Sequence, residues 1–168
     1  PQTIRDVRGW ISDQVESSLK RLNLTKISGI MLHDPDQILG NKGKAIFEGL
    51  NSLKNNHICE KIGLSIYDIA KVKDYISAFD IDLVQAPLNI FDRRLIDPVI
   101  IDILKSRDIE IHARSIFLQG LLLVKRDSIT DEFSHSKKLF DEWYSWLNQE
   151  DIDPLEVCLK FVLQFKEI

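Results

Sequence analysis

The chain has 168 residues, of which 44% are hydrophobic and 29% charged, and its formal net charge is −4. This balance is typical of one globular domain, here residues 1–168, and excludes a disordered or membrane-spanning chain. The negative charge argues against a nucleic-acid partner, and with no pattern of a secretory signal we expect a cytoplasmic protein without membrane contact.

Helical and extended patterns alternate along most of the sequence. Apolar residues at three- and four-residue steps predict helices, and short apolar runs between them predict buried strands. Asp97 followed by Pro98 predicts a helix start, with proline at the first helical position. The predicted helices are 4–22, 45–53, 69–79, 98–106, 139–147 and 154–165, and the predicted strands are 27–32, 62–65, 81–86 and 109–113. A polar loop is predicted at 127–136.

Strands that alternate with helices predict a parallel sheet with right-handed crossovers. Four strand–helix units are half of an eightfold barrel, which typically needs about 250 residues. An open, doubly wound sheet is the alternative, but its glycine-rich phosphate loop is missing, because Gly40-Asn-Lys-Gly43 lacks the required spacing. We therefore expect an α/β fold, an incomplete (β/α)₈ TIM barrel of about four units followed by C-terminal helices.

Polar residues follow the predicted strands at their carboxyl ends, where a parallel barrel builds its active site. They are His33 after the first strand, Ser65 at the end of the second, Gln85 near the end of the third, and Arg114 and Ser115 after the fourth. These five residues are the candidate site.

The strand ends and their neighbours resemble the aldo-keto reductase family. The segments that carry the resemblance are Leu32-His33-Asp-Pro35, Ile62-Gly-Leu-Ser65, Val84-Gln85-Ala-Pro-Leu-Asn89, and Ala113-Arg-Ser115 with Gly120-Leu-Leu122. The order of these segments matches the family from the helix before its fourth strand to the helix before its eighth. The resemblance implies a (β/α)₈ barrel that binds NADPH or NADH without a Rossmann domain.

The resemblance also implies roles for the candidate residues. His33 matches a histidine that orients the substrate's carbonyl group, which suits a neutral imidazole that can donate one hydrogen bond. Ser65 and Gln85 match residues that hold the nicotinamide carboxamide. Ser115 matches a serine beside the cofactor's diphosphate, and Arg114 stands where the family has an aromatic residue stacked on the nicotinamide.

Two departures from the family pattern affect the cofactor site. Ile66 replaces an asparagine that contacts the carboxamide, and Ile116 replaces a proline. Asn89 fits the family spacing after Gln85, with a turn role and a site role left open.

By this resemblance, the parent protein reduces an aldehyde, ketone or sugar carbonyl. The family's proton-donating tyrosine and its supporting lysine and aspartate precede the matching region, and Tyr67, Tyr75 and Tyr144 occupy other positions. We therefore expect the isolated chain to be inactive. Open sheet edges further predict a homo-oligomer or a covering barrel half.

Two alternatives come from other classes of protein. His33 and His112, with Asp34, Asp36 or Glu110, would suit a metal site in a hydrolase barrel. A barrel-derived binding or regulatory protein without catalysis is the other alternative, in which Trp143, Tyr144 and Trp146 would form a partner surface instead of packing a helix.

Cys59 and Cys158 are far apart in the sequence and form no CxxC pattern. We expect both to be core thiols.

Overall fold

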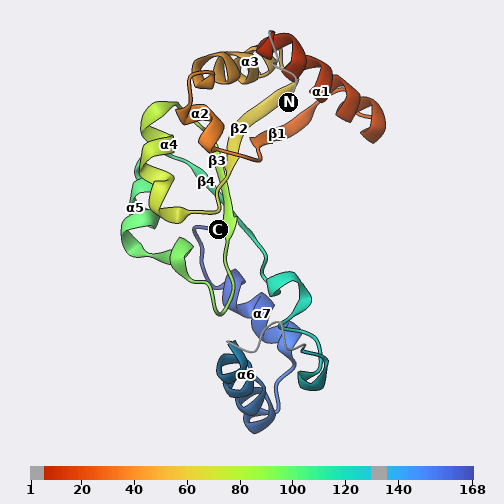
Figure 1. The fold of residues 1–168 in the computed structure, drawn as a ribbon, viewed down its shortest axis with the longest axis vertical. Helices are drawn as coiled ribbons and strands as arrows, with labels where there is room; N and C mark the ends of the chain where they lie inside the picture. Colours follow the sequence, from red (N-terminus) through yellow and green to blue (C-terminus); the bar gives the residue numbers. More distant parts are fainter. Residues whose placement is uncertain (1–5, 130–135) are drawn as a thin grey trace.

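The chain is described here from a computed structural model, which places residues 6–129 and 136–168 (Figure 1). The α-helices are α1 (Val7–Leu22), α2 (Asp36–Leu39), α3 (Gly43–Asn55), α4 (Val72–Ala78), α5 (Pro98–Ser106), α6 (Lys137–Glu150) and α7 (Pro154–Leu163). The strands are β1 (Ile27–Leu32), β2 (Cys59–Ser65), β3 (Leu83–Pro87) and β4 (Glu110–Arg114). Short 3₁₀ turns are η1 (Ile69–Lys71), η2 (Arg94–Ile96), η3 (Leu118–Gly120) and η4 (Arg126–Ser128). Ile4 of the first predicted helix and positions 130–135 of the predicted loop lie outside the described residues.

The four strands form one parallel sheet in the order β1-β2-β3-β4. Each strand lies beside the one that precedes it in sequence, so the winding never reverses. A doubly wound sheet requires a reversal of strand order, whereas a barrel does not. The fold is therefore an incomplete α/β barrel, as the sequence predicts.

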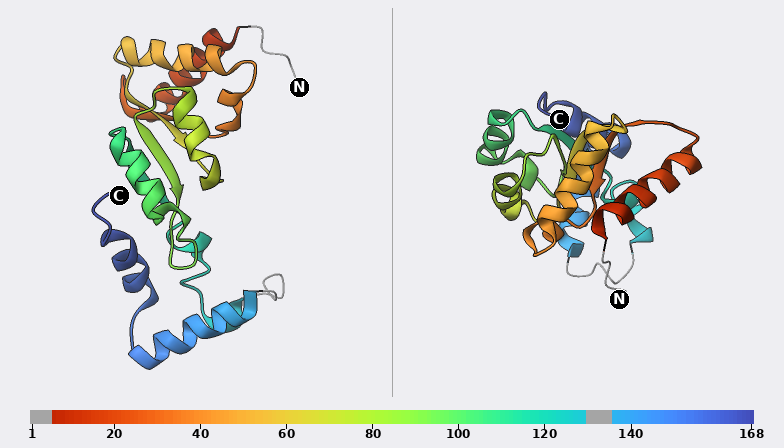
Figure 2. Two further views of the ribbon diagram at one scale, coloured as in Figure 1. Left: turned by 90° about the vertical axis from the view of Figure 1, so that its left-hand side faces the viewer. Right: turned by 90° about the horizontal axis from the view of Figure 1, so that it is seen from above.

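One face of the sheet is covered by helices. It is covered by α3, α4 and α5, and α1 packs on α3 (Figures 1 and 2). The residues that point to this side are almost completely buried, as in the register row Leu64, Val84 and Ile111. This layer is the main hydrophobic core.

The opposite face of the sheet has no helix on it within residues 6–129 and 136–168 (Figure 2). Side chains alternate along a strand, so the residues between the buried ones point to this open face. Met31 is 36% exposed there, and the side chains of Lys61, Glu110 and His112 are about equally accessible. In a closed barrel this face is the interior.

Two helices begin with an aspartate cap followed by proline. The Asp97 carboxylate accepts a hydrogen bond from the Val99 N–H at 2.9 Å, and Pro98 occupies the first turn of α5. The Asp153 carboxylate caps α7 in the same way, again with proline in the first turn. Both arrangements satisfy backbone N–H groups that have no partner inside the helix.

Most predicted elements are present with ends shifted by a few residues, and three differences are larger. The second strand begins at Cys59, where it pairs with Ile27 of β1, and the polar Glu60 and Lys61 hide this extension in the sequence. The third predicted helix is divided into η1 and α4, and the four-residue α2 was not predicted. Cys59 and Cys158 are both buried free thiols, as predicted.

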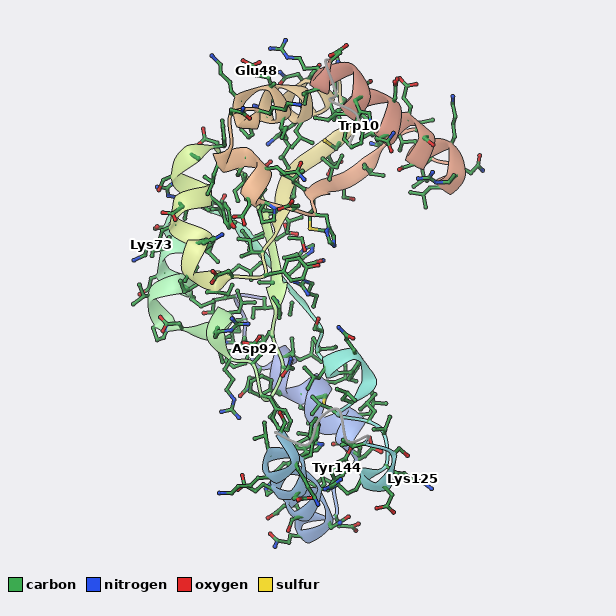
Figure 3. The ribbon with its side chains drawn as sticks, viewed as in Figure 1. Trp10, Glu48, Lys73, Asp92, Lys125 and Tyr144 are labelled. Atoms are coloured by element: carbon green, nitrogen blue, oxygen red, sulfur yellow. The ribbon has the colours of Figure 1, made fainter. Side chains whose placement is uncertain are left out.

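A second, smaller core lies between α6, α7 and the segment after β4. Trp143 is buried in it and donates its indole N–H to the Leu122 carbonyl oxygen at 3.3 Å. Figure 3 shows Tyr144 beside the segment that carries Lys125, and the Tyr144 hydroxyl donates to the Leu121 and Val124 carbonyls. These contacts favour the helix-packing interpretation of this aromatic cluster. Among the described residues, no helix is long and apolar enough to cross a membrane.

Candidate active site at the strand ends

The parallel register brings the predicted residues of neighbouring strands together. Ser65, the last residue of β2, pairs directly with Gln85 of β3, and Gln85 pairs with His112 of β4. All three side chains point to the open face. Ser65 is 5% exposed, and its hydroxyl and the Gln85 amide make no hydrogen bond with any described residue. Both groups are therefore available to a ligand.

His33 follows β1 and is exposed at the same end of the sheet. Its Nε2 atom lies 3.0 Å from the Tyr67 hydroxyl oxygen, and the two rings meet edge to face with 5.7 Å between centroids. The residues are 34 positions apart, so no short-range spacing could have indicated this pair. Tyr67 is 50% exposed and was not among the predicted site residues.

Arg114 packs against Tyr67 of the His33–Tyr67 pair. Its guanidinium carbon lies 4.0 Å from the centroid of the Tyr67 ring, a cation–π arrangement. The terminal nitrogens donate to the Ser115 hydroxyl at 3.3 Å and to the Ile66 carbonyl at 3.4 Å. The remaining nitrogen, Nε, is buried without a partner among the described residues, so one donor is left for a ligand.

Ser115 begins a strained segment. Ser115, Leu118 and Gln119 all have positive φ (57°, 48° and 56°), which costs energy for residues other than glycine. Such conformations concentrate at functional sites. No sequence pattern predicts this strain, because none of the three residues is glycine.

Asn89 fastens the turn after β3 to the end of β4. It is 1% exposed, its amide donates to the Ser115 carbonyl at 3.1 Å, and its side-chain oxygen accepts from the N–H groups of Phe91 and Asp92. Of the two roles left open by the sequence, the structure gives it the turn role.

Three polar side chains, Lys61, Glu110 and His112, also interact with one another on the open face. Lys61 pairs with Glu110, whose other oxygen lies 2.6 Å from His112 Nε2. The Lys61 ammonium, followed by His112, holds the pKa of Glu110 below its ordinary range. His33 and His112 thus have different partners, and no cluster of three or more metal-ligating side chains exists in the described ranges.

A buried tyrosine, a lysine and an aspartate also meet between the segments that follow β1 and β2. The Tyr75 hydroxyl donates to Asp36 at 2.6 Å, and Lys71 Nζ lies 2.9 Å from the same carboxylate. Burial, followed by the Asp36 contact, raises the pKa of Tyr75 above its ordinary value, which disfavours proton release. This group joins α2 to α4 and is structural.

Asp36 gives the stability of the chain a defined pH dependence. Tyr75 and then Lys71 lower the pKa of Asp36 below its ordinary value of 3.8. Above that pH, the charged Asp36 carboxylate and its partners raise the free energy of unfolding. This contribution is lost as the pH falls through the pKa that Asp36 has in the folded state. We expect Asp36→Asn to be less stable than wild type at pH 7, with the difference shrinking between about pH 5 and pH 2. Urea unfolding across this pH range measures it.

Glu16→Gln, at an exposed carboxylate of α1, is the control. Its free energy of unfolding should vary with pH as that of the wild type does. A deficit in Asp36→Asn that is as large at pH 2 as at pH 7 would contradict the assignment.

The fold and the site together define one class of protein, an α/β barrel with polar side chains at the carboxyl ends of its strands. The sequence model of the Aldo/keto reductase family matches residues 4–167. The chain belongs to the aldo-keto reductase family.

Solved structures give the same fold. The glycerol dehydrogenase AKR11B4 from Gluconobacter oxydans is 19% identical with a TM-score of 0.70, over 96% of this chain and 54% of that one. The aldo-keto reductase AKR11C1 from Bacillus halodurans, in its holo form, is 21% identical with a TM-score of 0.57, over 70% and 39%. The chain thus spans about half or less of these relatives. The search of curated protein sequences returned no match.

Proposed function

We propose that this chain is the part of an NAD(P)H-dependent aldo-keto reductase that orients a carbonyl substrate and holds the nicotinamide. The parent enzyme would reduce an aldehyde, ketone or sugar carbonyl. The observation that carries the proposal is the direct pairing of Ser65 with Gln85 beside His33, with both side chains making no hydrogen bond to any described residue.

The residues present suit a nicotinamide. A carboxamide has donors and acceptors, and a hydroxyl next to a side-chain amide can satisfy both kinds. The unpartnered Nε of Arg114 supplies another donor beside them. When bound, the reduced nicotinamide supplies a hydride to the carbonyl carbon. His33 would hold the carbonyl oxygen and stabilise the negative charge that develops there.

Ser115 would lie along the cofactor's diphosphate, as its match in the family implies. Arg114 would take the place of the aromatic residue that stacks on the nicotinamide, because a guanidinium plane can also stack on a ring. In the structure this plane already stacks on Tyr67. One side of the guanidinium is therefore occupied by Tyr67, and the nicotinamide would stack on its other side.

We also propose that further strands cover the open face, from a longer polypeptide or from a second copy of the chain. Within the described residues, β1 and β4 each have one unpaired edge, and unpaired edges favour association. No tyrosine here matches the family's proton donor, so we expect no NADPH oxidation with a simple aldehyde from this chain alone.

The cofactor site is tested by NADPH titration of the purified chain, followed by its fluorescence. Gln85→Ala should weaken NADPH binding about fivefold, because it removes a hydrogen bond worth about 1 kcal/mol. Gln14→Ala, at an exposed glutamine of α1, is the matched control and should bind as the wild type does. Equal affinities for Gln85→Ala and wild type, or no binding by wild type, would refute the site.

A further inference from the structure

A cavity of about 350 Å³ lies between α1, the end of β1 and the segment that joins α2 to α3. Leu32 of β1 lines it and pairs in register with Leu64, whose side chain points to the helix-covered side of the sheet. Ser65 and Gln85 point to the opposite, open face. The cavity is therefore separate from the residues proposed to hold the nicotinamide, and we call it the Trp10 cavity after its aromatic lining residue.

The lining of the Trp10 cavity is mainly apolar. Aliphatic surface comes from Val7 and Ile11 of α1, Leu32 of β1 and Ile46 of α3. Trp10 adds an indole ring that is 48% exposed, and among the described residues this ring has no aromatic partner and its N–H has no acceptor. Pockets for small molecules have volumes of about 300–1,000 Å³ and combine an apolar lining with a few polar groups. The size and lining of this cavity therefore suit a small planar ring that contacts the indole.

The polar lining residues of the cavity are Gln37, Asn41 and Lys42. Gln37 already donates to the Asp34 carboxylate at 3.1 Å, whereas the Asn41 side chain makes no hydrogen bond with any described residue. Lys42 brings a positive charge, and no aspartate or glutamate is among the described residues that line the cavity. An ammonium group beside an amide that can donate favours a carboxylate over a neutral polar group.

The helices beside the cavity are held in place by close packing. A Cβ atom on Gly49 of α3 would lie 2.9 Å from Ile11 Cδ1 of α1, so the two helices touch there. Arg8 of α1 and Glu48 of α3 form an ion pair beside this contact, and Figure 3 shows Glu48 and Trp10 on the two helices. The cavity is thus bounded by packed elements and is formed before any ligand binds, which lowers the cost of binding.

We propose that the Trp10 cavity binds a planar aromatic carboxylate of one or two rings. The ring would lie between the Trp10 indole and the aliphatic lining, and the carboxylate would accept hydrogen bonds from Lys42 and Asn41. The proposal does not depend on the proposed function, because the cavity and the nicotinamide site use different residues on opposite sides of the sheet.

The experiment is an NMR titration of the ¹⁵N-labelled chain with 2-naphthoate, followed by the indole N–H signals of its three tryptophans. We expect the Trp10 signal to shift and saturate, while the signal of the buried Trp143 stays unchanged. Trp10→Ala should weaken binding about tenfold, because an aromatic contact and apolar surface are lost. The backbone amide signals of residues 40–42 report the affinity of this variant. Trp146→Ala removes a tryptophan of similar exposure, 40%, from α6 and should leave the affinity unchanged.

The carboxylate is tested with 2-naphthamide, which has the same rings and no charge. Lys42→Gln should weaken 2-naphthoate binding about fivefold and leave 2-naphthamide binding unchanged, because only the carboxylate gains from the ammonium group. Lys44→Gln, at a nearby exposed lysine of α3, is the matched control and should change the affinity for neither compound.

Three results would overturn the proposal. No saturable shift at Trp10, or equal affinities for Trp10→Ala and wild type, would remove the cavity as a binding site. Equal losses in Trp10→Ala and Trp146→Ala would mean unspecific contact with exposed indoles. If Lys42→Gln weakens the binding of both compounds equally, or of neither, the ligand is not selected as a carboxylate.

Discussion

Replacing Leu64 with alanine is expected to destabilise the fold by about 2–5 kcal/mol, the usual cost of deleting a buried leucine side chain. Leu64 is 1% exposed and lies in the middle of the sheet, in register with Leu32 on one side and Val84 on the other. Its side chain points to the face covered by helices, where the surrounding strands and helices cannot collapse into the space left. Urea unfolding at neutral pH measures the change in the free energy of unfolding.

Met31→Ala is the matched control, because Met31 lies one strand away on the opposite face and is 36% exposed. We expect it to cost less than about 1 kcal/mol. Comparable losses for the two variants would mean that the face carrying Met31 is buried in solution, as a second copy of the chain or the helices of a doubly wound sheet would bury it.

Replacing Gly43 with alanine is expected to cost about 3 kcal/mol, at the upper end of the range for overpacking. A Cβ atom at this position would lie 1.8 Å from the Ile38 carbonyl oxygen, so backbone has to move. Gly43 begins α3, and Ile38 belongs to the short α2. The glycine is needed because these two helices approach closely here. Thermal and urea unfolding both report the loss.

Gly40→Ala, three residues earlier, provides the comparison. Its nearest neighbour would be the Gln37 carbonyl oxygen at 3.5 Å, an ordinary contact, and its φ of −82° suits any residue. We expect a change within about 0.5 kcal/mol. If Gly43→Ala lowers the free energy of unfolding no more than Gly40→Ala does, the close approach of α2 and α3 is not present in solution.

The parallel sheet and the relative positions of three site residues could be predicted from sequence. Apolar runs separated by helical patterns predict parallel strands. The polar residues at the strand ends must then lie together at the carboxyl-end face of the sheet. Ser65 and Gln85 do pair across β2 and β3, and His33 follows β1 at the same end. Their roles toward a cofactor or substrate remain predictions.

The contacts that sequence patterns did not indicate are long-range. Tyr67 meets His33 across 34 positions, and Tyr75 meets Asp36 across 39. Such pairs depend on how adjacent loops fold back over the sheet, which neither spacing nor hydrophobic periodicity encodes. The four-residue α2 was missed for a related reason, since one helical turn is too short to show a 3.6-residue period.

Arg114 departs from the family pattern, and its contacts in the structure show what the arginine does there. In the sequence it only replaces an expected aromatic residue. In the structure its guanidinium covers the Tyr67 ring and donates to the Ile66 carbonyl oxygen. Arg114, the last residue of β4, and Ile66, which follows β2, both depart from the family pattern and contact each other through this hydrogen bond.

We propose that this half barrel holds a nicotinamide at the carboxyl ends of its strands. The most direct test is ¹H–¹⁵N NMR mapping of the chain during NADPH titration. We predict that the signals of Ser65, Gln85 and Arg114, including the Gln85 side-chain amide, shift together and saturate. Signals that shift elsewhere while these stay unchanged, or no saturable shift at any of them, would contradict it.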